Sequence, residues 1–432
     1  MQEHPVLGQV ALGYSPMIDR QRAVVATRLT IFPDRPDAAP DTKALFAALQ
    51  DVWPAPEADA PLQLKLRPLN PSAVDQRGAA ASVSAGSAGG ASAPVSLNIA
   101  GEAMLHAVME SQPPTHLMIE VPAFIASDPA NLFTLRELHA AGNPLLIKGR
   151  PLTPLTPEVL ACFAHSIVDV SDERRGTVAP APGVRNVTTV QAGARTSAEI
   201  DLAFQRGAVA VLGWPFDDPA PRATGRTTVP PDVKVVLDLI HGVDRELPVA
   251  RLEDVLKRDP TLAFRLMRYL NSPAFGLSVE INSFAHALML LGYQRLKRWL
   301  AVLLASASKG AGARHLMFAA VRRGMVMEEL GRTQGDAEMR GEMFICGVFS
   351  LLDRLLQQPF EELLRNVPVP ERVQQALRGD GGPYAPYLEL LRAIEDEAVF
   401  DIRESSERLM LSPMEVNRAV LTALHGARQI DG

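Results

Sequence analysis

The chain has 432 residues, of which 43 are basic and 49 acidic, giving a formal net charge of −6. Apolar residues make up 47% and charged residues 21%, which is typical of a globular protein and excludes a coiled coil, a fibrous protein or a wholly disordered chain. The length predicts two or three domains. Neither half carries the basic excess expected of a module that neutralises many phosphates.

Targeting and redox signals favour a cytoplasmic protein. The opening MQEHPVLGQVALGYS lacks a basic segment followed by an apolar one, so we expect no signal peptide. The apolar run that begins at Trp299 has seven residues, far fewer than the roughly 20 needed to cross a bilayer. Cys162 and Cys346 stand far apart in apolar stretches, which favours buried free thiols; a disulfide between them is the alternative.

Residues 1–215 alternate short apolar runs with helical patterns. The predicted strands are Ala23–Ile31, Val95–Ile99, His116–Val121, Pro144–Lys148, Ser166–Val170, Asn186–Gln191 and Ala208–Leu212. The predicted helices include Asn131–Ala141, closed by Gly142, then Pro157–Ala164 and Ser197–Gln205. Continuous apolar strands separated by helices are typical of a parallel sheet, and seven or eight such units predict a β/α barrel.

Two segments stand outside this pattern. Pro71–Pro94 is mostly Ala, Ser and Gly and is predicted to be a flexible surface insertion. Pro215–Pro231 holds five prolines and is the natural domain junction, which divides the chain into residues 1–225 and residues 226–432. The junction is short, so we expect the two domains to pack on one another.

From Pro230 onward the pattern is helical to the end. Asp259-Pro260 predicts an N-cap followed by Pro at the first helical position. Ser412-Pro413, with Glu415 three residues after the Ser, predicts a capping box at the start of the last helix. We therefore expect an all-helical second domain.

Residues 247–304 carry a series of motifs at defined spacing. They are Leu247-Pro248, Arg258-Asp259-Pro260, the LNSPAFG turn at Leu270–Gly276, Ile281-Asn282-Ser283, and Leu290-Leu291-Gly292 before Arg295. The series resembles the HDOD domain, an all-helical relative of the HD phosphohydrolases that is regarded as a non-catalytic output module. The segment MFICGVFSLLDRLLQQPFEELL is similar to the version of this domain that follows EAL-type domains.

The first half fits that pairing. GYSPMIDRQRAVVATRLTIF resembles the opening of an EAL-type cyclic di-GMP phosphodiesterase barrel, although Ser15 stands where the family has Gln. VSLNIA, HLMIEV and AVLGWPF resemble later strands of that barrel. The resemblance implies a bacterial signalling protein with a degenerate EAL-like (β/α) barrel in residues 1–225 and an HDOD domain in residues 226–432.

The resemblance also implies which residues would be metal ligands. EAL phosphodiesterases hold two metal ions with carboxylates and an Asn at strand ends. Arg28 stands at the signature Glu position, whereas Asn98 and Glu120 match the next two ligands. The other departures from the pattern are Lys148, Arg150, Ile167, Gln191 and Leu212. Two surviving ligands cannot hold two metal ions, so we predict no catalytic residue, no bound metal and no cofactor.

The remaining polar residues of the barrel leave two interpretations open. Asn98 and Glu120 are vestigial positions that are either hydrogen-bonded locally or kept as residual ligands. Arg28, Lys148 and Arg150 either form ion pairs at the barrel mouth or neutralise a phosphate.

The helical half lacks the other catalytic motif. HD hydrolases use a His-Asp dyad with further ligands to hold metal, and none of the nine histidines is followed by Asp. Ser350-Leu351 stands at the dyad position. His286 and His315 lie in helical patterns typical of structural or surface histidines.

A basic cluster lies in the same half. Its members are Arg295, Lys297, Arg298, Lys309, Arg314, Arg322 and Arg323. A solvated helix face is the simplest interpretation, and an acidic partner or nucleic acid is the alternative. We expect a partner groove on the helical half, rimmed by some of Arg295, Arg298, Arg322 and Arg323. We expect Asn271, in the LNSPAFG turn, to have a structural role worth about 1–2 kcal/mol.

These observations favour a non-catalytic adaptor that acts through protein–protein contacts of its HDOD domain. The alternative is a cyclic di-GMP receptor in which a catalytically dead barrel binds the nucleotide and signals through the helical half. An active phosphodiesterase conflicts with the ligand positions. The expected partners are proteins of a signalling pathway; we expect no membrane partner, the charge disfavours nucleic acid, and homodimerisation stays open.

Overall fold

The computed structural model describes residues 4–35, 37, 40–54, 94–151, 154–173, 187–218, 231–256, 284–306, 313–367 and 369–431. The predicted insertion up to residue 93, the Asp259-Pro260 cap and the LNSPAFG turn with Asn271 lie outside these ranges.

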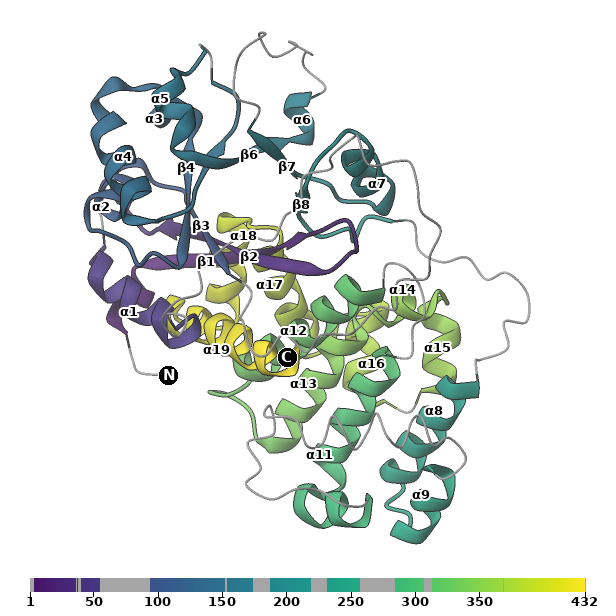
Figure 1. The fold of residues 1–432 in the computed structure, drawn as a ribbon. Coiled ribbons are helices and arrows are strands. Elements are labelled where there is room, and N and C mark those ends of the chain that lie inside the picture. The colour runs from purple at the N-terminus through teal and green to yellow at the C-terminus, as the bar shows by residue number, and fades with distance from the viewer. Residues whose placement is uncertain are drawn as a thin grey trace, which may run out of the picture.

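The first half is a closed barrel of eight strands that pair in chain order (Figure 1). The strands are β1 (Val10–Ile18), β2 (Val24–Pro33), β3 (Val95–Ile99), β4 (Leu117–Pro122), β5 (Leu145–Lys148), β6 (Phe163–Asp169), β7 (Thr188–Ala192) and β8 (Ala210–Leu212). The helical segments of this half are η1 (Pro5–Gly8), α1 (Thr42–Val52), α2 (Glu102–Glu110), α3 (Ala123–Ser127), η2 (Pro129–Asn131), α4 (Leu132–Ala141), α5 (Pro157–Ala161), α6 (Val170–Glu173) and α7 (Ser197–Gln205). The predicted β/α barrel is confirmed.

One strand departs from the expected parallel sheet. β1 was not among the predicted strands, and it runs antiparallel to both β2 and β8, whereas β2 to β8 are parallel. The short link between β1 and β2 leaves no room for a crossover helix, so the two strands form a hairpin. The predicted helix Pro157–Ala164 also ends early, because Phe163 begins β6. Gly142 closes α4 at φ 98°, as predicted.

The second half is helical in every part that the structure describes. Its helices are α8 (Pro231–Asp244), α9 (Val249–Leu256), α11 (Phe284–Ser306), α12 (Ala313–Leu330), α13 (Ala337–Phe349), α14 (Leu352–Leu356), α15 (Phe360–Asn366), α16 (Glu371–Arg378), α17 (Ala385–Glu395), α18 (Val399–Arg408) and α19 (Pro413–Asp431). The predicted capping box is confirmed: Ser412 Oγ accepts from the Glu415 N–H at 3.3 Å, and the Glu415 carboxylate accepts from the Ser412 N–H at 2.8 Å.

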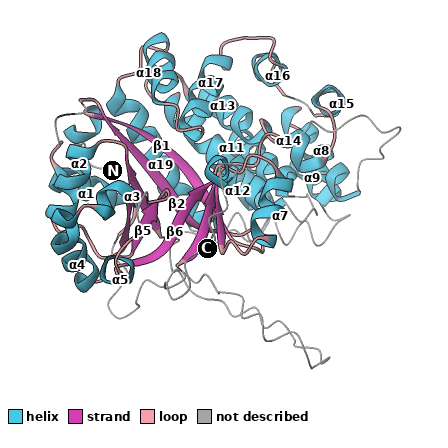
Figure 2. Ribbon diagram, turned by 90° about the horizontal axis from the view of Figure 1, so that it is seen from above, coloured by secondary structure: helices cyan, strands magenta, loops and turns pink. Residues whose placement is uncertain are grey.

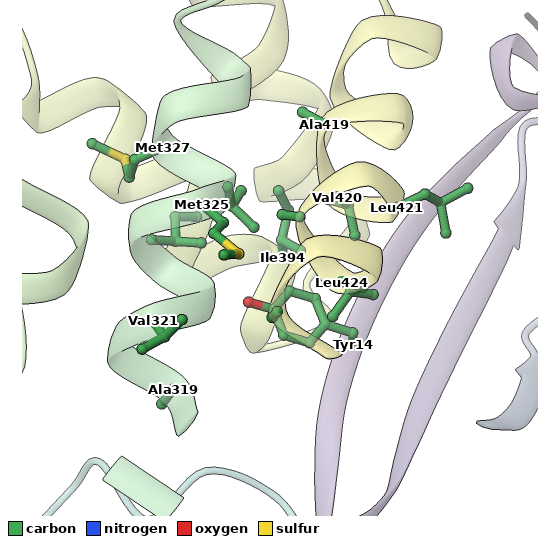
Figure 3. Packing of buried hydrophobic residues seen from close by; sticks show 14 of the residues in the cluster. Tyr14, Ala319, Val321, Met325, Met327, Ile394, Ala419, Val420, Leu421 and Leu424 are labelled. Atoms are coloured by element: carbon green, nitrogen blue, oxygen red, sulfur yellow. The ribbon is translucent and has the colours of Figure 1, made fainter. Parts of the chain in front are cut away.

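β1 joins the two halves. Along this strand, Met17 points into the barrel interior, whereas Leu12 and Tyr14 point outward into the large core that includes the helical half. Figure 3 shows Tyr14 beside Ile394 of α17 and Leu424 of α19. Seen from above, the helices of the second half lie along one side of the barrel (Figure 2). The predicted packing of the halves is confirmed, and the contact is a shared apolar core.

A buried amide fixes this contact. Asn417 of α19 is 1% exposed, and its Nδ2 donates to the carbonyl oxygens of Leu7 at 2.8 Å and Val10 at 2.7 Å. Its Oδ1 accepts from the N–H of Leu12 at 3.0 Å. Three backbone groups, one in η1 and two at the start of β1, are thus satisfied by a side chain from the far end of the chain, which sets the position of α19 on the barrel.

Both cysteines are buried free thiols, as expected from their apolar contexts. Burial raises the pKa of both thiols, so neither is a reactive thiolate at neutral pH.

The crossing of α12 and α13 depends on a glycine. A Cβ on Gly347 would lie 2.5 Å from the carbonyl oxygen of Arg323, so only glycine lets the two backbones approach this closely. We expect Gly347→Ala to lower the free energy of unfolding by about 1–3 kcal/mol through overpacking. Chemical denaturation measures it.

Gly341→Ala in the same helix is the matched control, because its Cβ would meet no atom within 4 Å. We expect this variant to be neutral or stabilised by up to about 1 kcal/mol. Equal losses in the two variants would contradict the close-packing argument.

Candidate functional site at the barrel mouth

The barrel interior has an apolar floor and a polar layer above it. The floor is formed by side chains such as Met17, Met118 and Leu146, all buried. The polar layer lies toward the carboxyl ends of the parallel strands, which is the end where β/α barrels place their sites. Its members come from β1 to β5 and from the turn between α17 and α18; they are Ser15, Arg28, Thr30, Ser96, Asn98, Glu120, Lys148 and Glu397.

Arg28 and Glu120 form a buried ion pair inside the barrel. Arg28 Nη2 donates to Glu120 Oε2 at 2.7 Å, and the Glu120 side chain is 0% exposed. The other carboxylate oxygen accepts from Ser96 Oγ at 2.9 Å. The guanidinium of β2 therefore supplies the positive charge that this carboxylate of β4 needs in a low-dielectric interior.

Asn98 and Lys148 form a second pair. Lys148 Nζ donates to Asn98 Oδ1 at 2.8 Å, and Asn98 Nδ2 donates to Thr30 Oγ1 at 3.0 Å. The sequence-predicted positions Asn98, Glu120, Arg28 and Lys148 are thus brought together. Glu120 pairs with Arg28, and Asn98 hydrogen-bonds Lys148 and Thr30.

The layer is completed by a residue from the other half. Glu397, between α17 and α18, accepts from Ser15 Oγ at 2.8 Å and from Thr30 Oγ1 at 2.7 Å. Its carboxylate lies 3.8 Å from Arg28 Nη1. Sequence reasoning missed this residue, because nothing near position 397 indicates that its partners lie more than 360 residues away in the chain.

The charges of the layer shift the pKa values of its two cations in opposite directions. Burial alone would lower the pKa of Arg28, but the carboxylates of Glu120 and Glu397 outweigh it and raise that pKa. Burial, with the nearby Arg28 charge, lowers the pKa of Lys148. Arg28 is therefore a fixed cation, and Lys148 holds its proton less tightly than an exposed lysine.

The polar layer does not fit a pair of metal ions. Each oxygen that the family resemblance would assign as a ligand already accepts a hydrogen bond from a side-chain donor: Glu120 from Arg28 and Ser96, and Asn98 from Lys148. A guanidinium and an ammonium thus stand against these oxygens. Among the described residues, no group of three or more His, Cys, Asp or Glu could hold a metal ion.

Three other sequence-predicted positions lie outside this network. Ile167 and Leu212 lie in the apolar floor. Gln191 lies on the opposite face of β7 from Val190 and Ala192, which both point inward, and its Nε2 donates to the carbonyl oxygen of Val168 at 2.7 Å.

A cavity of about 730 Å³ opens beside the polar layer, at the ends of β3, β4 and β5. Its lining includes the basic residues Lys148 and Arg150, apolar side chains such as Leu105 and Phe124, and also Ser127 and the acidic Glu102. Phe124 is 63% exposed, an unusual position for a phenylalanine.

An arginine contacts Ser350, the residue that the resemblance places at the dyad position of the helical half. Arg323 of α12 is 4% exposed and donates to both carboxylate oxygens of Glu395, at 2.6 to 3.0 Å. Its Nη1 donates to Ser350 Oγ at 3.0 Å, and its guanidinium carbon lies 4.4 Å from the centroid of the Phe216 ring.

The expectation of a solvated basic face is therefore wrong for part of the cluster. Arg322 is 3% exposed and, like Arg323, cannot rim a surface groove. Arg298 pairs with Glu328 at 2.5 Å and Lys297 pairs with Asp244. The side chains of Arg295 and Arg314, and all of Lys309, lie outside the described residues. The carboxylate of Glu395, 72 residues away in the chain, explains the burial of Arg323, and a local pattern cannot reveal it.

Comparison with protein-family models finds a match in part of the helical half. Residues 229–363 match the HDOD domain. The match spans α8 to α14 and most of α15, and it ends before α16. The helices α17 to α19, which pack on β1, lie beyond it.

Two curated relatives are similar to larger parts of the chain. The uncharacterized protein YuxH of Bacillus subtilis strain 168 is 28% identical over 294 residues, which cover 65% of this chain and 71% of that protein. The cyclic di-GMP phosphodiesterase CdgJ of Vibrio cholerae serotype O1 is 28% identical over 168 residues, 39% of each chain, so the match spans well under half of that relative.

A solved structure and the hydropathy of the helices complete the comparison. The structure titled PaMucR Phosphodiesterase, c-di-GMP complex, covers 49% of this chain and 92% of its own, at 15% identity and a TM-score of 0.27. Within the described residues, no helix has the length and apolar character needed to span a membrane.

The buried pair in the barrel predicts a loss of stability when its cation is removed. Arg28→Met would leave Glu120 buried with its counter-charge removed, so we expect a loss of about 3–5 kcal/mol in the free energy of unfolding near neutral pH. Chemical denaturation of the variant and of the unaltered chain measures it.

The double variant Arg28→Met/Glu120→Gln is the control, because it removes both charges. We expect it to regain more than half of the loss at neutral pH. A double variant less stable than the single one would contradict the argument that Arg28 compensates the buried Glu120 carboxylate.

Proposed function

We propose that this protein is a non-catalytic regulatory protein of a cyclic di-GMP-related signalling system, which acts through protein–protein contacts of its HDOD region. The observation that carries the proposal is that basic side chains bind the ligand-like residues at the barrel mouth. Arg28 and Lys148 donate to Glu120 and Asn98, the two positions that resemble metal ligands. An internal cation at each position leaves the reaction without the metal ions that would polarise a phosphodiester and activate water.

The helical half supports the same proposal. Ser350 stands where an HD hydrolase would have its His, and the hydroxyl accepts from Arg323 and donates to the carbonyl oxygen of Gly347 at 2.7 Å. The resemblance of CdgJ, whose name describes a cyclic di-GMP phosphodiesterase, supports the signalling context. The match to the HDOD domain supports an output role for residues 229–363.

The proposal predicts catalytic silence. Purified full-length protein incubated with cyclic di-GMP and Mg²⁺ or Mn²⁺ should form linear dinucleotide no faster than buffer does, as measured by chromatography. Turnover that Glu120→Ala abolishes would overturn the proposal. Turnover that Glu120→Ala leaves intact would point to a contaminating enzyme.

A second candidate function is a nucleotide receptor, and the cavity at the ends of β3 to β5 favours it. Lys148 and Arg150 could face a phosphate there, and Phe124 offers an aromatic surface for a base. The cavity volume of about 730 Å³ falls in the range of small-molecule sites.

The receptor candidate predicts a charge-dependent affinity. If the full chain binds cyclic di-GMP in isothermal titration, Lys148→Ala should weaken binding by about tenfold or more, because it removes a charge-assisted contact. Lys43→Ala, an exposed lysine on α1 outside the cavity, should leave the affinity unchanged. Absence of heat with the unaltered chain would favour the adaptor over the receptor.

A further inference from the structure

The turn between α17 and α18 ties three parts of the molecule together. Its three consecutive acidic residues each have a different partner: Glu395 pairs with Arg323 of α12, Asp396 with Arg195 at 3.2 Å, and Glu397 with the barrel mouth. Arg195 lies between β7 and α7. The turn therefore contacts the helical core, a barrel loop and the barrel interior at once.

The backbone of the turn is specialised for this contact. Glu397 has φ 56°, a left-handed conformation that is uncommon for a residue with a side chain. Gly13 of β1 faces it, and a Cβ on Gly13 would lie 2.9 Å from the carbonyl oxygen of Ile394 and 3.1 Å from Glu397 Cα. The missing side chain at position 13 makes room for the turn to enter the mouth.

The Glu397 carboxylate lies in an anion-binding site formed by Ser15, Thr30 and Arg28, here called the cradle. Two hydroxyl donors, Ser15 and Thr30, each bond one carboxylate oxygen, and the Arg28 guanidinium lies 3.8 Å away. A phosphodiester presents the same pattern, a single negative charge shared by two oxygens. The cradle thus matches a phosphodiester in charge and in the number of acceptors.

Hydrogen bonds connect the cradle to the neighbouring cavity. Lys148, which lines the cavity, donates to Asn98; Asn98 donates to Thr30; and Thr30 donates to Glu397. An anion that engages Lys148 from the cavity side competes with Asn98 for this cation. The hydrogen bonds from Asn98 to Thr30 and from Thr30 to Glu397 then lose the cation that anchors them at the cavity end.

We propose that the Glu397 carboxylate is an internal competitor for a phosphodiester-bearing ligand at the barrel mouth, and that the ligand displaces it and releases the α17–α18 turn. This inference rests on the receptor candidate above, since it requires that the mouth accept an anion. It makes the contact autoinhibitory. Through the Glu397 side chain, the conformation of the helical half would depend on whether a ligand occupies the barrel mouth.

The test is a titration of full-length variants with cyclic di-GMP as the phosphodiester probe. Glu397→Ala should bind it about tenfold or more tightly than the unaltered chain, because the competitor is gone. Glu397→Gln keeps the shape but loses the charge, so its affinity should fall between the two. Asp396→Asn is the matched control, because it alters the same turn outside the cradle, and its affinity should equal that of the unaltered chain.

A structural readout accompanies the titration. Amide hydrogen exchange of residues 395–402 should increase when the probe binds the unaltered chain, and it should already be raised in Glu397→Ala without the probe. Equal affinities for the Ala variant and the unaltered chain, or absence of binding to every variant, would overturn the inference. Neither result would touch the adaptor proposal, which depends on the hydrolysis assay. Hydrolysis by the unaltered chain would overturn that proposal and leave the affinity comparison valid.

Discussion

The structure depends on the direction of one strand. β1 runs antiparallel to its neighbours, so it is joined to β2 by a hairpin, and no crossover helix lies between them to cover its outer face. That face carries Leu12 and Tyr14, which must leave water. The helical half supplies the cover with α17 and α19, and Asn417 binds the strand backbone. The two halves consequently share a single core.

The same arrangement brings charge to the barrel. Because α17 packs on β1, the turn that follows it lies beside the barrel mouth, where Glu397 meets Ser15 and Thr30. Arginine takes a comparable place in each half: Arg28 pairs with Glu120 in the barrel, and Arg323 pairs with Glu395 in the helical domain. These two buried carboxylates therefore each have a fixed counter-charge. Removing one partner of such a pair is strongly destabilising, because it leaves the other charge buried and uncompensated.

Local sequence predicted what local physics decides. β3 and α7 were predicted with the bounds that the structure has, because an apolar run and a capping box at Thr196 define them. β1 was missed because Gly13 and Pro16 weaken the strand signal. Gly13 has a tertiary role, since a side chain there would collide with the α17–α18 turn. The resemblance found Arg28, Asn98, Glu120 and Lys148 in the site. It could not find Glu397 or the burial of Arg323, since their partners are distant in sequence.

The shared core has a consequence for how this protein can be dissected. A chain divided at the proline-rich junction would remove α17 and α19 from the barrel and expose the apolar outer side of β1, with the backbone groups that Asn417 now binds, to water. Such a fragment would expose an apolar surface, prone to non-specific binding, that is buried in the intact molecule. Proteins captured by an isolated half would reflect that artificial surface, so partner mapping belongs with point variants of the full chain.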